Sequence, residues 1–174
     1  MKIGYFKIYS ENNKRFVGGI MVADERGIPV EFKYTEPVEP TKIQEVLYGD
    51  VLEKYLREEV IMANLVGKLE NKPDIYIVND AKNIYLQEIV REDVAVIRKT
   101  QVSPMKEIKS YKFIKDNEAV VQLKDGENPV VIMIQKENKE EIVKKIADIG
   151  ENTDLIEPLN RVEEALELIC RGEL

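Results

Sequence analysis

The chain has 174 residues, of which 44% are hydrophobic and 34% charged, and its 26 basic and 33 acidic residues give a formal net charge of −7. This length favours one domain with at most a small second lobe. The acidic balance makes nucleic acid an unlikely partner and counts against an anionic membrane surface, because both would be repelled. The sequence has no His, which excludes Ser-His-Asp and Cys-His catalysis and any His metal ligand.

The pattern of cysteines and apolar runs bears on the cellular compartment. Cys170 is the single cysteine, so the chain has no internal disulfide and no cysteine cluster for zinc. No apolar run approaches about 18 residues, and the N-terminus lacks the features of a secretory signal. We therefore expect a cytoplasmic protein with no membrane partner. The dominance of Lys and Glu among the charged residues is typical of the surfaces of thermophile proteins.

Three strands joined by short turns open the chain. They are expected at Ile3–Tyr9, Arg15–Asp24 and Ile28–Glu36, where apolar residues recur in strand patterns. Their short connections predict an antiparallel meander. Within the second strand, Gly18-Gly19 indicates either a bulge or a close approach of backbone.

A sharp corner follows the third strand. Pro37 and Pro40 cannot donate sheet hydrogen bonds and therefore end the strand. Thr41 with Gln44 fits a capping box, which predicts a short helix over Lys42–Tyr48. Gly49-Asp50 then interrupts the helix. Asp50 with Glu53 fits a second capping pair, which predicts a long helix over Val51–Glu70.

The rest of the chain alternates strands and helices. A strand at Asp74–Asp80, a short helix and a strand at Val94–Lys99 predict a parallel pair. Thr100–Ser110 is the best candidate for a linker. Three strands and two amphipathic helices complete the sequence. The prediction is a mixed α/β fold with a lobe over residues 1–102 and a smaller α+β lobe over 103–174.

The order of elements over residues 3–99 resembles the ribonuclease H-like fold, an antiparallel meander that continues into parallel strands. Members of that superfamily hold two Mg²⁺ ions with carboxylates from the first strand, the first helix and the end of the fourth strand. The resemblance implies Glu11, Glu45 and Asp80 as catalytic and metal-binding candidates, with Mg²⁺ or Mn²⁺ as cofactor. It departs from the superfamily at Glu11, which follows the first strand instead of lying within it. The stretches GGIMVADERG, EFKYTEPVEPT and DLIEPLNRVEEAL also resemble an uncharacterised family of prokaryotic proteins.

The corner itself is a second candidate site. A strand end and a helix N-terminus meet there, and free N–H groups at a helix N-terminus suit an anion. The side chains that would line such a pocket are Tyr34, Thr35, Glu36, Thr41, Gln44 and Tyr48. The alternative is that Thr41 and Gln44 only cap the helix while the tyrosines pack at the rim.

These observations leave three functional hypotheses. The leading one is a non-enzymatic binding or interaction module with an unknown protein partner, able to form a homo-oligomer through an edge strand or the C-terminal helix. The alternative is a phosphodiesterase or nuclease of ribonuclease H-like type that depends on Mg²⁺ or Mn²⁺. The third is anion or nucleotide binding at the corner over residues 34–48.

Overall fold

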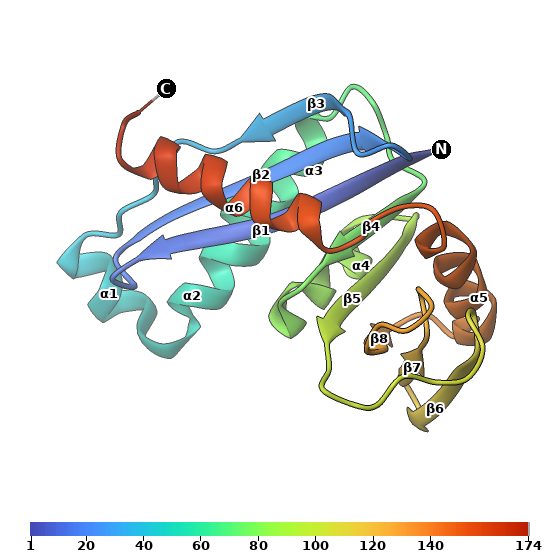
Figure 1. Ribbon diagram of the computed structural model, residues 1–174. Helices are drawn as coiled ribbons and strands as arrows, with labels where there is room; N and C mark the ends of the chain where they lie inside the picture. The colour runs from blue at the N-terminus through green and yellow to red at the C-terminus, as the bar shows by residue number, and fades with distance from the viewer. Residues whose placement is uncertain (174) are drawn as a thin grey trace.

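The computed structural model describes residues 1–173, and one mixed eight-stranded sheet forms its centre (Figure 1). The order of strands across the sheet is β3-β2-β1-β4-β5-β8-β7-β6. The strands are β1 (Lys2–Glu11), β2 (Arg15–Asp24), β3 (Pro29–Tyr34), β4 (Ile75–Val78), β5 (Asp93–Lys99), β6 (Tyr111–Lys115), β7 (Glu118–Val121) and β8 (Val130–Ile134). The helices are α1 (Lys42–Tyr48), η1 (Gly49–Val51), α2 (Leu52–Tyr55), η2 (Leu56–Met62), α3 (Ala63–Lys68), η3 (Ala81–Tyr85), α4 (Leu86–Ile89), α5 (Lys139–Gly150) and α6 (Glu157–Cys170).

The first three strands form the predicted antiparallel meander. β1 and β2 pair in an unbroken register from Lys2↔Asp24 to Glu11↔Arg15. Asn12 and Asn13, both with φ of 54°, are the central residues of the turn between them, which the Lys14 N–H closes by donating to Glu11 O at 3.0 Å. Two consecutive residues with positive φ are the mark of a type I′ hairpin turn, and Asn adopts that conformation more readily than most residues.

The centre of the sheet is parallel and its far side antiparallel. β1, β4 and β5 run parallel to one another, and β8 then pairs antiparallel with β5. The predicted mixed α/β class, with a meander continuing into parallel strands, is confirmed. The division into lobes 1–102 and 103–174 stays a prediction, although one sheet contains strands of both segments.

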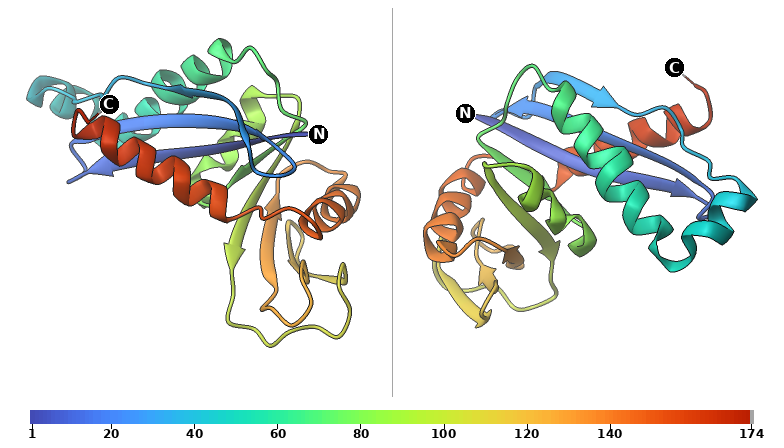
Figure 2. Two further views of the ribbon diagram at one scale, coloured as in Figure 1. Left: turned by 45° about the horizontal axis from the view of Figure 1, so that its top comes forward. Right: turned by 180° about the vertical axis from the view of Figure 1, so that it is seen from behind.

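Helices cover both faces of the sheet (Figure 2). On one face α6 returns to pack on β1 and β2, while α5 packs on β7 and β8. The composite helix over Leu52–Lys68 and the shorter α4 cover the other face. Side chains of each strand alternate between the two faces, so β1 contributes Tyr5 to the core under α6 and Phe6 to the core under the composite helix.

Gly18 lies in β2 where the composite helix approaches most closely. The β1–β2 register is regular at this point, and the irregularity in β2 falls between Val22 and Ala23 instead. A Cβ at Gly18 would meet Ile61 Cγ2 at 2.1 Å. Of the two sequence interpretations of Gly18-Gly19, the close approach is therefore correct for Gly18.

The composite helix is irregular where a single long helix was predicted. It follows the 3₁₀ turn η1, begins as α2, widens into the π-helix η2 over Leu56–Met62, and ends in α3. π-Helical turns are rare and occur frequently at functional sites. Neither this helix nor any other within residues 1–173 is long and apolar enough to cross a membrane.

Candidate active site

A small cavity lies where the parallel strands β1 and β4 end. Ligands of open α/β sheets bind beyond the carboxyl ends of such strands. The cavity has a volume of about 90 Å³. We call it the β1–β4 cavity, and its lining residues are Ile8, Ser10, Asn13, Phe16, Glu53, Arg57, Ile61, Asp80 and Asn83.

Charged side chains of α2, η2 and η3 meet at the mouth of the cavity; Glu53 and Arg57 line it, whereas Lys82 reaches Glu53 from outside its lining. Arg57, on the π-helix, donates from Nη2 to Glu53 Oε1 at 2.6 Å. Lys82, in η3, donates from Nζ to the same Glu53 oxygen at 3.1 Å. The Arg57 side chain is only 14% exposed, whereas Glu53 and Lys82 are more than half exposed. Glu53 therefore lies between two cations at the mouth of the cavity.

Asp80 occupies the end of β4 and begins the next turn of helix. Its Oδ1 accepts a hydrogen bond from the backbone N–H of Lys82 at 2.9 Å, which makes it the N-cap of η3. One oxygen of the carboxylate is thus used for structure. The second oxygen has no described hydrogen bond within residues 1–173.

Asn83 is the buried polar member of the cavity. Its residue surface is only 2% exposed, yet its side-chain amide has no described hydrogen bond within residues 1–173. The amide atoms of Asn83 are not fully enclosed, because within residues 1–173 the one completely buried side-chain polar atom without a partner is Arg15 Nε. Since Asn83 lines the cavity, its amide is available to a group bound there.

A larger groove adjoins the β1–β4 cavity and shares Asn13, Phe16 and Glu53 with it. It has a volume of about 580 Å³. Glu45 of α1 and Asp50 of η1 lie along it, as does Lys82. We call it the α1–α2 groove. A deep polar cavity that opens into a wider groove suits a small charged group attached to a larger molecule.

Two of the three acids predicted from the sequence line these two places. Asp80 lies in the β1–β4 cavity and Glu45 in the α1–α2 groove. Glu53, which was not predicted as a site residue, lines both. Glu11 points to the other face of the sheet, where its Oε2 accepts a hydrogen bond from Cys170 Sγ at 3.3 Å. Burial raises the pKa of the Cys170 thiol, and this hydrogen bond raises it further. Within residues 1–173 no three acidic or Cys side chains converge closely enough to hold a metal ion.

Most polar side chains of the predicted corner site are used to stabilise the chain itself. Thr35 is buried, and its Oγ1 accepts a hydrogen bond from Gly18 N at 3.0 Å. Thr41 and Gln44 form the predicted capping box, with bonds of 3.2 and 2.9 Å. Tyr34 stacks on Phe32, and Tyr48 on Tyr55. Glu36 is exposed. Anion or nucleotide binding at this corner stays a prediction.

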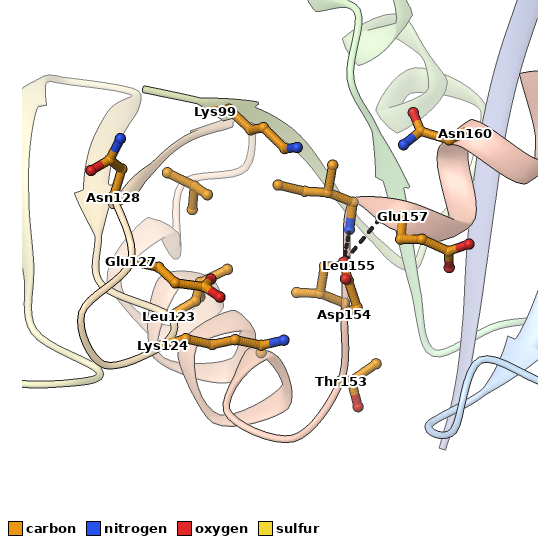
Figure 3. Close-up of a pocket in the computed structure, with 13 residues that line it drawn as sticks. Lys99, Leu123, Lys124, Glu127, Asn128, Thr153, Asp154, Leu155, Glu157 and Asn160 are labelled. Atoms are coloured by element: carbon orange, nitrogen blue, oxygen red, sulfur yellow. Dashed lines mark hydrogen bonds between the residues drawn. The ribbon is translucent and has the colours of Figure 1, made fainter. Parts of the chain in front are cut away.

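Figure 3 shows another cavity, of about 460 Å³, between the β7–β8 turn and the start of α6. Lys99 and Lys124 reach into it opposite Asp154, whose Oδ1 accepts from the backbone N–H groups of Ile156 and Glu157. Partial burial opposes ionisation of Asp154, but these hydrogen bonds and the two lysines together lower its pKa. Because Glu127 and Glu157 also line the cavity, its charge is mixed and indicates no class of ligand.

The fold is similar to those of solved endonuclease V structures. The endonuclease V of Bacillus subtilis matches 98% of this chain and 80% of its own, with a TM-score of 0.65 and 12% identity. The endonuclease V of Streptomyces avermitilis matches 99% and 82%, with a TM-score of 0.66 and 10% identity. The Ciona intestinalis endonuclease V, solved in complex with DNA containing an inosine, has a TM-score of 0.57 and 14% identity. The fold is that of the ribonuclease H-like nucleases. No protein-family model and no curated protein matches the sequence.

These relatives correct two expectations. The leading hypothesis of a non-enzymatic binding module is wrong, because the matched structures, which span nearly the whole chain, are nucleases and favour the nuclease alternative. The argument from net charge against nucleic acid also fails, because an acidic total does not describe one local surface and a relative of this fold is solved with DNA. The homo-oligomer and protein partner stay predictions.

Three residues of the cavity were not singled out from the sequence as site residues. Glu53 is explained there as the second half of a capping pair, and nothing in the sequence pattern marks Arg57 or Asn83. The i, i+4 spacing of Glu53 and Arg57 on one helix is the signal that was available. Their proximity to Asp80 depends on the pairing of β1 with β4, which short sequence patterns do not predict.

Proposed function

We propose that this protein is a nuclease that hydrolyses phosphodiester bonds of nucleic acid at the β1–β4 cavity. The observation that carries the proposal is the position of Asp80 and Glu53. Both carboxylates line one cavity at the carboxyl ends of β1 and β4, in a chain whose fold matches endonuclease V over 98–99% of its length. The α1–α2 groove beside the cavity gives a polynucleotide chain room to continue.

The donor set fits one hard divalent cation better than the two-ion centre of the superfamily. Mg²⁺ keeps several waters and is bound in proteins by one or two carboxylates together with substrate phosphates. Asp80 and Glu53 supply two carboxylates. β1 contributes Ile8 and Ser10 to the cavity, and neither is an acid. Asp80 and Glu53 would therefore hold a single Mg²⁺ or Mn²⁺, which would polarise the phosphate and lower the pKa of a bound water.

The chain's own side chains account for the remaining needs of the reaction. Arg57 and Lys82 supply positive charge for the phosphate oxygens, on which negative charge increases as the bond breaks. Asn83 can donate or accept a hydrogen bond from its buried amide and so fix the orientation of the bound group.

Cleavage assays with a matched pair of variants test this proposal. Wild-type protein is incubated with single-stranded and double-stranded DNA and RNA, and with DNA containing inosine, in Mg²⁺ or Mn²⁺. We expect cleavage of at least one substrate, and a loss of at least about 100-fold in Asp80→Asn. Asn remains a good N-cap residue, so η3 should be preserved in this variant.

The control is Asp116→Asn, which removes an exposed carboxylate in the β6–β7 turn, remote from the cavity. It should cleave like wild type. Cleavage that survives Asp80→Asn unchanged would contradict the proposed site. Absence of cleavage of every substrate by a folded wild-type protein would contradict the proposed activity.

A further inference from the structure

Glu53 is held by two cationic side chains. Arg57 Nη2 and Lys82 Nζ both donate to its Oε1, at 2.6 and 3.1 Å. The site proposed for cleavage needs the same three groups in other roles: Glu53 as a ligand of the divalent cation, and the two cations as partners of phosphate. Glu53 cannot use the same oxygen fully for the ion pairs and for a cation, and Arg57 and Lys82 cannot pair fully with both Glu53 and phosphate.

We propose that Arg57 and Lys82 form a phosphate-binding clamp whose charges Glu53 pairs with until a divalent cation binds. A divalent cation and phosphate should therefore bind with positive coupling. With a divalent cation bound, Glu53 would serve as its ligand, and Arg57 and Lys82 would be free to bind the phosphate. The inference rests on the proposed function for the identity of the site, but it concerns binding and can be measured without cleavage.

Charge balance argues for the exchange. Without a metal ion, the carboxylates of Glu53 and Asp80 would repel a phosphate placed in the cavity. With a divalent cation bound, these two negative charges are neutralised. Arg57 would otherwise keep its charge unpaired with only 14% of its side chain exposed, which is costly. A phosphate that accepts hydrogen bonds from the guanidinium removes that cost.

The size and lining of the cavity agree with phosphate as the bound group. A cavity needs a volume of about 10–15 Å³ to hold one water molecule. The β1–β4 cavity, at about 90 Å³, therefore holds a few waters or one small oxyanion. It is too small for a nucleobase together with its sugar. The buried amide of Asn83 offers two donors to the same space. The larger α1–α2 groove would then take the rest of the nucleotide.

Arg57 lies on the same face of the helix as two other residues of the cavity. It is the second residue of η2, and Ile61 lies one turn further along; both line the cavity. Glu53, one turn before Arg57, lines it as well. This spacing brings Arg57 to the carboxyl ends of β1 and β4 beside Glu53.

The test is a titration of the full-length protein with Mn²⁺, with free Mn²⁺ measured by electron paramagnetic resonance, with and without inorganic phosphate. We expect phosphate to lower the Kd for Mn²⁺ about tenfold, within the usual range of coupling between two sites. Mn²⁺ should lower the Kd for phosphate by the same factor.

The variants should change two quantities in opposite directions: the affinity for Mn²⁺ without phosphate should rise, and the effect of phosphate on that affinity should fall. In Arg57→Gln, Mn²⁺ should bind several-fold more tightly than in wild type when phosphate is absent, because a competitor for Glu53 is gone. Phosphate should then improve Mn²⁺ binding less than about twofold. Lys82→Gln should change both quantities in the same directions, and because Lys82 is 61% exposed this variant carries little risk of misfolding. Lys54→Gln, an exposed charge change on the same helix, should behave like wild type.

Weaker Mn²⁺ binding in Arg57→Gln without phosphate would overturn the proposal, because it would mean that the pair positions Glu53 for the metal. Failure of Mn²⁺ to bind, or equal coupling in all variants, would also overturn it. Coupled binding without cleavage of any nucleic acid would support the clamp and contradict only the proposed activity. Cleavage with no effect of phosphate on Mn²⁺ would contradict only the clamp.

Discussion

Gly18 illustrates how one residue determines the packing behind the site. Its Cα faces the π-helix, and a Cβ there would meet Ile61 Cγ2 at 2.1 Å. Ile61 itself lines the β1–β4 cavity. The missing side chain at Gly18 therefore lets the helix that carries Glu53 and Arg57 lie close to the sheet. Gly67, near the end of the same composite helix, has open space where its Cβ would be.

These two glycines predict opposite effects of alanine. Gly18→Ala should lower the free energy of unfolding by about 1–3 kcal/mol, because the added methyl group over-packs a core without room for it. Gly67→Ala should raise it by about 0.5–1 kcal/mol, because alanine favours the helix. Urea denaturation of both variants beside wild type measures these changes. A Gly18→Ala protein as stable as wild type would show that the helix moves away at no cost.

At the scale of elements, local signals predicted some helices and strands well and others poorly. Thr41 and Gln44 specify the start of α1, and the helix over Lys42–Tyr48 was predicted with its observed limits. The π-helix was not predicted, because a change from i−4 to i−5 hydrogen bonding leaves no mark in the periodicity of side chains over so few residues. Asp50 and Glu53 fit a helix start, yet the structure has a 3₁₀ turn at Gly49–Val51 and uses Glu53 in ion pairs.

The arrangement of strands shows the same limit. Short turns predicted the meander, and the crossover between β4 and β5 predicted their parallel pairing. The pairing of β5 with β8 joins residues distant in the sequence, from Ala95↔Ile134 to Lys99↔Val130, and no local pattern predicts it. For the candidate site, element order predicts Asp80 and Glu45, which line the β1–β4 cavity and the α1–α2 groove, but it does not predict the direction in which Glu11 faces. An odd-numbered position in β1 directs Glu11 to the face covered by α6.

Across the whole molecule, the groups with a displaced pKa fall into two sets, one displaced toward acid pH and one toward alkaline pH. The sequence has no His, and the five carboxyl groups with a displaced pKa all have it lowered. At Asp24, for example, the hydrogen bond from Arg26 is the main cause. The displaced Tyr, Lys and Cys groups all have raised pKa values and titrate on the alkaline side.

This division predicts the pH dependence of stability. A carboxyl group with a lowered pKa in the folded state stabilises the protein above its unfolded pKa, near 4, and this contribution is lost as the pH falls through the folded value. The free energy of unfolding should therefore be level between about pH 5.5 and 8 and decline below about pH 4.5. Denaturant titrations at a series of pH values measure it. A step between pH 6 and 7 would contradict this prediction, because the sequence has no His and the five displaced carboxyl groups all have a lowered pKa.

The central claim is that Asp80 and Glu53 form a site for a divalent cation at the carboxyl ends of β1 and β4. The most direct measurement is a crystal structure of the protein with Mn²⁺ and inorganic phosphate, examined by anomalous scattering from manganese. We predict one strong manganese peak in the β1–β4 cavity, bound by both carboxylates, with phosphate beside Arg57. A cavity without manganese, or a peak at Glu11 on the opposite face of the sheet, would contradict the claim.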